Sequence, residues 1–259
     1  MPRFAANLTM MFNEVPFLDR FKAASDAGFT AVEFLFPYEH SPEEVAARAK
    51  AAGVQMVLFN MPAGNWTAGE RGITGLPGRE QEFRDGVDKA LAYAGPLGVP
   101  RLHAMAGIAP AGADPAACRS TLIANLRYAA QKLAERNLTL LLEAINTRDM
   151  PGFLVSTQKD SRAICEEVGA PNLKMQMDLY HMQIMEGDLA ANLKRYASQC
   201  GHIQIAGCPE RHEPDTGEIR YEYLFRLMDE IGYEGWVGCE YRPAGKTIDG
   251  LRWLSAAAR

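Results

Sequence analysis

The chain has 259 residues with 27 basic and 32 acidic side chains, so its formal net charge is −5. Because there is no surplus of positive charge to neutralise phosphates, the composition disfavours general nucleic-acid binding. Hydrophobic residues make up 47% and charged residues 23%, which excludes a disordered chain. The length suits one α/β barrel of about 250 residues as well as two smaller domains.

The amino-terminal segment MPRFAANLTMMFNEVPF contains polar residues that interrupt any signal-peptide core. No stretch approaches the roughly 20 apolar residues that span a bilayer. The five cysteines are scattered and form no Cys-x-x-Cys pair, which is typical of reduced thiols. We therefore expect a cytoplasmic protein without a membrane partner.

Short apolar runs alternate with stretches of helical periodicity along the whole chain. The runs predict strands over residues 4–12, 31–36, 54–61, 100–107, 138–145, 173–181, 202–207 and 236–241. Helical patterns between them include residues 17–28, 43–53, 82–98, 121–137 and 221–232. Several of the helical stretches end in a glycine, the residue that favours a left-handed C-cap, at Gly28, Gly53, Gly98, Gly169 and Gly232.

This repeated order predicts a single (β/α)8 TIM barrel over residues 1–259, with an outer ring of helices. The alternative is an open, doubly wound sheet. The segment NEVPF after the first strand lacks the glycine-rich turn that such a sheet uses to bind a dinucleotide, which favours the barrel.

The longest irregular connection covers residues 63–79, AGNWTAGERGITGLPGR. It has no Gly-Lys-Ser/Thr sequence and is therefore not a nucleotide-binding P-loop. Connections of this length are usually functional or mobile. We predict a lid over the active site, with Arg71 facing an anionic substrate. The alternative is a surface excursion with Trp66 packed under it.

Polar side chains end the last four predicted strands. Glu143 follows LTLLL, Asp178 follows LKMQM, Gln204 lies in HIQIAG and Glu240 follows WVGC. The carboxyl ends of barrel strands share one face, where catalytic groups gather. Three carboxylates there would repel one another, and no comparable set of strand-end Lys or Arg is present to neutralise them. We therefore predict a divalent cation, and oxygen ligands alone favour Mg²⁺ or Mn²⁺ over zinc. The alternative is that each acid pairs with an arginine or caps a helix.

Distinctive segments are spread over essentially the full length: RFAANLTMMF, VEFLFPY, AGERGI, PGREQEFRDGV, NLRYAA, DLYHMQ, HIQIA, EPDTGEI and GWVGCEY. Through them the chain resembles the hydroxypyruvate isomerase family, within the xylose-isomerase-like TIM barrels. The resemblance implies metal binding at Glu143, Asp178, Gln204 and Glu240, and a paired acid/base role for Glu143 and Glu240. Many members of the wider superfamily carry a metal-binding histidine where this chain has Gln204, which leaves an all-oxygen set of ligands here.

The reaction that the resemblance implies interconverts hydroxypyruvate and tartronate semialdehyde (2-hydroxy-3-oxopropanoate) through an enediolate. The alternative substrate is a 2-oxotetronate, one carbon longer. A pocket discriminates one such group by only about 1–3 kcal/mol, so motifs do not decide between them. More remote alternatives are a metal-dependent nuclease of the same superfamily and a barrel that binds a sugar acid without catalysis.

Several further side chains are candidates for contact with the substrate. Arg71 and Arg211 are expected to meet its carboxylate, although a surface salt bridge is the competing role for either. His181, three residues after Asp178, is expected to bind a substrate oxygen. We expect structural or solvent roles for His40, His103 and His202. The carboxyl-terminal stretch GLRWLSAAAR either covers a neighbouring copy in a homo-oligomer or caps its own barrel.

Overall fold

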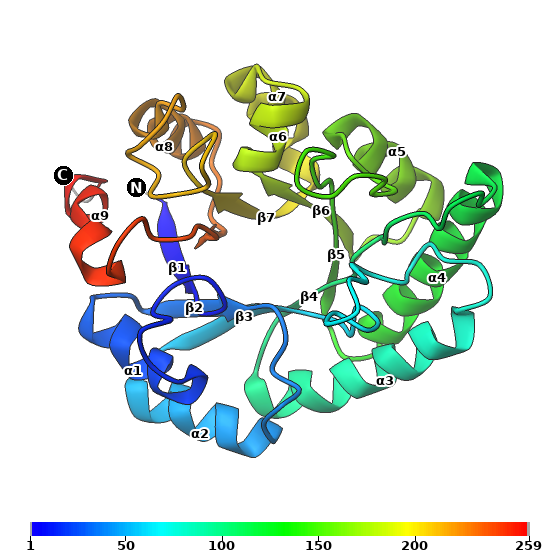
Figure 1. Ribbon diagram of the computed structural model, residues 1–259, viewed down its shortest axis with the longest axis horizontal. Coiled ribbons are helices and arrows are strands. Elements are labelled where there is room, and N and C mark those ends of the chain that lie inside the picture. Colours follow the sequence, from blue (N-terminus) through cyan, green and yellow to red (C-terminus); the bar gives the residue numbers. More distant parts are fainter. Residues whose placement is uncertain (1, 258–259) are drawn as a thin grey trace.

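Eight parallel strands close into a barrel in chain order, with β8 returning to β1, in the computed structural model, which describes residues 2–257 (Figure 1). The predicted barrel is therefore confirmed, and the open sheet is wrong. The strands are β1 (Arg3–Asn7), β2 (Ala31–Phe34), β3 (Gln55–Asn60), β4 (Arg101–His103), β5 (Thr139–Glu143), β6 (Leu173–Asp178), β7 (Cys200–Ile205) and β8 (Trp236–Cys239).

Helices form a ring outside the strands (Figure 1). They are α1 (Phe17–Asp26), α2 (Pro42–Ala52), α3 (Glu80–Leu97), α4 (Pro115–Ala134), α5 (Gln158–Val168), α6 (Leu179–Met185), α7 (Leu189–Tyr196), α8 (Tyr221–Glu230) and α9 (Arg252–Ala257), with short 3₁₀ turns η1 (Ala197–Gln199) and η2 (Thr247–Gly250). Left-handed glycine C-caps end α2, α3 and α5, as the sequence predicts. Within residues 2–257, no helix combines the length and apolar character needed to cross a bilayer.

The strands are shorter than the apolar runs that predict them, because polar side chains turn the backbone at their carboxyl ends. After β1, the side chain and carbonyl of Asn7 accept the backbone N–H groups of Thr9, Met10 and Met11. After β6, the Asp178 carboxylate accepts the backbone N–H of Tyr180 at 2.8 Å and caps α6. The chain thus leaves the barrel wall at the face where the predicted site residues lie.

The main hydrophobic core lies between the barrel and the helical ring, where it includes large buried side chains such as Phe21, Phe59 and Leu126. A much smaller apolar cluster includes Ala5, Ala31, Leu58 and Leu141 from four of the strands. Polar side chains occupy other strand positions, which leaves an unusually polar barrel interior.

The carboxyl-terminal segment packs on its own barrel. The Trp253 ring lies 5.1 Å from Phe4 and 6.3 Å from Tyr241, centre to centre, and its Nε1 donates to the Tyr241 hydroxyl at 3.3 Å. The carboxyl-terminal stretch was expected either to cover a neighbouring copy or to cap its own barrel, and Trp253 packs on its own barrel. Residues 258–259 of that stretch lie outside the described part of the chain.

Candidate active site

The four strand-end residues are all buried. Glu143 ends β5 at 4% exposure, Asp178 ends β6 at 0%, Gln204 lies in β7 at 2%, and Glu240 follows β8 at 9%. Strand register places Asp178 opposite Gln204, while the backbone N–H of Glu240 donates to the carbonyl of Ile205. The closed barrel thus brings side chains that are nearly 100 residues apart to one end of neighbouring strands.

Arg211, in the loop after β7, joins two of the acids. Its Nη2 lies 3.3 Å from Asp178 Oδ2 and 3.2 Å from Glu240 Oε1, and its guanidinium stacks over the Tyr180 ring at 4.9 Å. Its backbone φ of 59° is in the left-handed region, which costs a non-glycine residue roughly 1–2 kcal/mol. The surrounding loop holds this conformation, because the Arg211 carbonyl accepts the N–H of Arg242. The predicted substrate-binding arginine therefore lies within the acid cluster.

Burial and mutual repulsion favour the protonated forms of the acids. Burial raises the pKa of Glu143 well above its usual value, and Glu240 and Asp178 raise it further. Burial also raises the pKa of Asp178 and brings that of Glu240 to about 8, although Arg211 opposes both shifts. One buried guanidinium therefore does not compensate three buried carboxylates.

His181 offers an N–H group to this cluster. The Asn146 side-chain oxygen accepts the backbone N–H of Asp149, so its amide nitrogen faces His181 Nδ1 at 2.6 Å and must donate to it. The remaining proton of the neutral ring is then on Nε2, 3.8 Å from Glu143 Oε1 and 3.6 Å from Asp178 Oδ2. Burial lowers the pKa of His181, which favours this neutral form.

His103, for which we expected a structural role, lies beside Glu143. It ends β4, and its Nε2 is 3.8 Å from Glu143 Oε2 with no hydrogen-bond partner. Burial lowers the pKa of His103 to about 3, so the ring is neutral. Its position at a strand end, like that of the acids, is the sequence signal that would have placed it in the site.

Glu33 is a further buried acid for which the sequence pattern predicted no role. It lies in β2, and its carboxylate accepts hydrogen bonds from Gln204 Nε2 at 2.8 Å and Asn7 Nδ2 at 3.0 Å. His202 Nε2 is 2.6 Å from its other oxygen. The signal in the sequence is an acid inside the apolar run AVEFLF.

The donor set suits a hard divalent cation. Side-chain ligand atoms of Glu143, Asp178 and His181 lie within 4.8 Å of one another. The proton on His181 Nε2 makes that atom a donor and leaves the carboxylate oxygens as the ligands. Glu143 Oε1 is buried without a hydrogen-bond partner, as expected of an atom whose partner is an ion. Oxygen donors of this kind favour Mg²⁺ or Mn²⁺.

Arg71 makes contacts within its own loop. Its guanidinium stacks over the Trp66 ring at 4.1 Å and donates to the carbonyls of Trp66 and Glu70. Trp66 in turn packs on Phe36, which follows β2. Trp66 and Phe36 line a cavity of about 630 Å³ at the carboxyl end of the barrel, together with Arg242. The structure therefore places Arg71 in a loop that borders this cavity, and its contact with substrate stays a prediction.

The second half of the loop is packed tightly against the connection after β4. Gly72 has a φ of +110°, and a Cβ added to it would lie 2.4 Å from the Met105 carbonyl oxygen. Thr74 Oγ1 donates to the same carbonyl at 2.7 Å, and Asn125 Nδ2 donates to the Thr74 carbonyl at 2.8 Å. By contrast, Gly69 in the first half has open space around it. This packing opposes motion of the second half, so the predicted lid would have to move through the first half.

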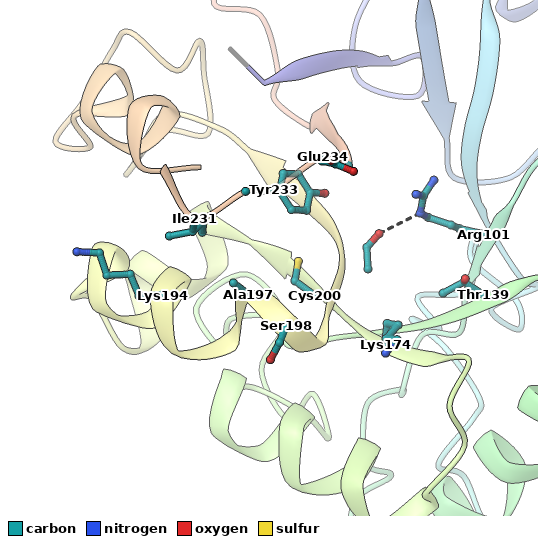
Figure 2. Close-up of a pocket in the computed structure, with 13 residues that line it drawn as sticks. Arg101, Thr139, Lys174, Lys194, Ala197, Ser198, Cys200, Ile231, Tyr233 and Glu234 are labelled. Carbon is teal, nitrogen blue, oxygen red and sulfur yellow. Dashed lines mark hydrogen bonds between the residues drawn. The ribbon is translucent and has the colours of Figure 1, made fainter. Parts of the chain in front are cut away.

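A second cavity, of about 660 Å³, lies at the opposite end of the barrel (Figure 2). It is lined by residues at the amino ends of strands, among them Arg101 and Lys174, and by Lys194 of α7. Arg101 donates to the Gly201 carbonyl at 2.9 Å, while Lys194 points away from both other cations (Figure 2). This cavity contains none of the predicted site residues, so the candidate active site stays at the carboxyl ends of the strands.

Comparison with known proteins agrees with this architecture. A family model described as a xylose isomerase-like TIM barrel matches residues 21–257. The chain belongs to the xylose isomerase-like TIM barrel family. A 2-oxo-tetronate isomerase of Cupriavidus necator is 59% identical, and a hydroxypyruvate isomerase of Escherichia coli is 47% identical, each with 98% of both chains covered.

Two solved structures match over nearly the full chain. A crystal structure from Brucella melitensis, described as an AP endonuclease of family 2, is 53% identical with a TM-score of 0.97 and covers 99% of both chains. The apo structure of the 3-keto-D-glucoside 4-epimerase YcjR from E. coli has a TM-score of 0.82 at 21% identity, with 99% of both chains covered, which shows the shared fold alone.

Proposed function

We propose that this protein is a metal-dependent isomerase of a small hydroxy-keto acid. The observation that carries the proposal is a buried cluster of acids: Asp178 and Glu240 both contact Arg211, and ligand atoms of Glu143 and Asp178 lie within 4.8 Å of each other. Relatives named hydroxypyruvate isomerase and 2-oxo-tetronate isomerase cover nearly the full chain and support it. Of the two substrates, the higher identity to the Cupriavidus protein favours the four-carbon acid over hydroxypyruvate.

Oxygen atoms of Glu143, Asp178, Gln204 and Glu240 would hold the ion, with Mg²⁺ favoured and Mn²⁺ as the alternative. When bound, a divalent ion supplies Lewis-acid stabilisation of the negative charge that develops on the substrate oxygens. Two side chains of the protein would also stabilise this negative charge. His181 offers its Nε2 proton to a substrate oxygen, and the Arg211 guanidinium is suited to the substrate carboxylate.

Glu143 and Glu240 form the proton-transfer pair in this proposal. The carboxylate of one glutamate removes a proton from the hydroxylated carbon, and the carboxyl group of the other glutamate returns a proton to the former carbonyl carbon. At the same time, the hydroxyl proton passes to the former carbonyl oxygen, so that the product is an isomer of the substrate. A bound cation opposes the effect of burial on the pKa of both glutamates and favours the ionised carboxylate that a base requires.

The test is a proton-exchange and turnover assay on chelator-treated protein. Hydroxypyruvate and 2-oxotetronate are incubated in heavy water with and without Mg²⁺ or Mn²⁺, and NMR follows both isomerisation and deuterium uptake at carbon. We expect metal-dependent turnover of at least one acid. Tight metal binding without deuterium uptake from either acid would refute the isomerase and favour a barrel that only binds.

The similarity to the Brucella protein, described as an AP endonuclease, motivates a nuclease as a second candidate. A net charge of −5 and only five histidines argue against it, because such a nuclease needs a basic groove for the DNA backbone and a histidine-rich metal site. Salt-sensitive cleavage of a duplex that contains an abasic site, absent from Glu143→Gln, would support the nuclease. Intact duplex under conditions of isomerase turnover would exclude it.

A further inference from the structure

The carboxylate of Glu33 crosses the barrel interior from β2 to β7 and β8. The residue is 1% exposed, and its oxygens meet Gln204, Asn7 and His202 at 2.6–3.0 Å. Space for it exists because β8 carries a glycine, since a Cβ on Gly238 would lie 2.3 Å from Glu33 Oε2. Burial of a carboxylate costs several kcal/mol. Three other strands offset this cost for Glu33, because β1 and β7 supply its hydrogen-bond partners and β8 supplies the space.

The hydrogen bonds of Glu33 fix which way its carboxylate presents an acceptor. The Asn7 side-chain oxygen accepts the backbone N–H of Thr9 at 3.1 Å, so its amide nitrogen must be the atom facing Glu33 Oε1. Oε1 is therefore an acceptor. The Gln204 amide, which meets the same oxygen at 2.8 Å, must also turn its nitrogen toward it.

This constraint decides where the Gln204 oxygen lies. With Nε2 held by Glu33, Oε1 takes the other side of the amide, where it accepts from Gln176 Nε2 at 2.7 Å. A carbonyl oxygen has a second lone pair, which is then available to a cation. Without an acceptor at Glu33, the amide can rotate by half a turn and present its nitrogen, which is not a ligand.

We infer that Glu33 is a positioning residue that orients the Gln204 amide so that β7 contributes an oxygen donor to the metal site. The inference rests on the proposed function, because it takes Gln204 as a ligand. It also explains the amide at this position: a side chain here must donate to Glu33 and accept from Gln176, and neither a carboxylate nor a single histidine nitrogen does both.

A purely structural role for Glu33 is the competing explanation, because its bonds to Asn7 and His202 also hold strands together. The two explanations differ in how Glu33 and Gln204 affect metal affinity jointly. A carboxylate has two equivalent oxygens and no wrong orientation. Gln204→Glu therefore removes the need for an orienting partner, and in the wild-type background it also sets a second carboxylate against Glu33.

The experiment measures Mn²⁺ affinity by calorimetry, without substrate, for wild type, Glu33→Leu, Gln204→Glu and the double variant. Leucine fills a similar volume but offers no acceptor to the Gln204 amide. Loss of an outer partner of a ligand typically weakens metal binding by about 10–100-fold, and we expect Glu33→Leu to fall in this range. Gln204→Glu should then raise affinity at least about tenfold more in the Glu33→Leu background than in wild type. The matched control Asn7→Ala removes a different bond to Oε1 and should keep affinity within about threefold.

Equal effects of Gln204→Glu in both backgrounds would overturn the inference while leaving the isomerase proposal intact. Wild-type protein that binds no Mn²⁺ would instead overturn the metal site and the inference together. Thermal unfolding of the metal-free variants reports whether each one folds. If Glu33→Leu does not fold, Glu33→Asp carries the same comparison, because it withdraws the carboxylate from Gln204 by one methylene and keeps the charge.

Discussion

The glycine in β8 provides a direct test of the polar barrel interior. In Gly238→Ala, the new methyl group would lie 2.3 Å, 2.4 Å and 2.5 Å from the three carboxyl atoms of Glu33. Contacts this short force the carboxylate to move. Gly238 has no unusual backbone angle, so alanine would otherwise be favourable by roughly 0.5–1 kcal/mol at a strand position.

The expected loss combines two effects. Overpacking a well-filled interior costs about 1–3 kcal/mol, and displacement of the carboxylate breaks at least one charge-assisted hydrogen bond worth about 1.5–3 kcal/mol. Allowing for the backbone gain, the free energy of unfolding should fall by about 2–5 kcal/mol. Urea titration of the metal-free protein at fixed pH measures this change, with an unchanged slope as the sign that both states keep their compactness.

Two further variants make the prediction specific. Gly245→Ala in the loop after β8 is the control, because an added Cβ meets nothing within 4 Å and the residue has no left-handed φ, so this change should be close to neutral. Glu33→Asp shortens the acid, so the double variant Glu33→Asp/Gly238→Ala should be about 1–2 kcal/mol more stable than the sum of the single changes. Strict additivity, or a Gly238→Ala protein as stable as wild type, would show that the carboxylate does not occupy the space beside Gly238.

Three other predictions concern the site. Glu143→Gln and Glu240→Gln each keep an oxygen donor but remove a proton-transfer group. Turnover should therefore fall about a hundredfold or more, while Mn²⁺ binding measured by calorimetry persists. If either variant stays active, the glutamate that it replaces does not transfer a proton. Burial raises the pKa of Glu240 from 4.5 to about 8, so its contribution to folding is fully present below pH 4.5 and is lost as pH rises through 8. Urea titrations with a chelator should therefore show that the free energy of unfolding of wild type falls relative to that of Glu240→Gln over this pH range. Titrations with Mg²⁺ in place of the chelator should recover the loss near pH 8. Parallel pH profiles of the two proteins would contradict this prediction. Arg71→Ala should raise KM for the keto acid about tenfold with kcat and thermal stability retained; an unchanged KM would assign this arginine to the loop alone.

The fold was predictable because alternation of apolar runs and helical periodicity extends over the whole chain. The acids at the ends of β5, β6 and β8 were predictable for a related reason, since each interrupts an apolar run where a parallel strand ends. Glu33 and His103 also interrupt apolar runs, but this signal alone did not give them a role in the site, because strands of a parallel barrel are buried on both faces and the sequence does not say which side faces inward. The register irregularity between Val32 and Glu33 adds to this difficulty, since a local shift re-aims a side chain without leaving a signal in the sequence.

The tight packing of Gly72 against the Met105 carbonyl decides where this protein tolerates redesign. Residues 67–69 form an exposed tip, whereas residues 72–76 are buried and pack against the neighbouring connection. Longer segments should therefore be tolerated between Thr67 and Gly69. The same insertion near Gly72 would push the loop backbone away from the Met105 carbonyl, with which it is in direct contact, and would disrupt the packing at this end of the barrel.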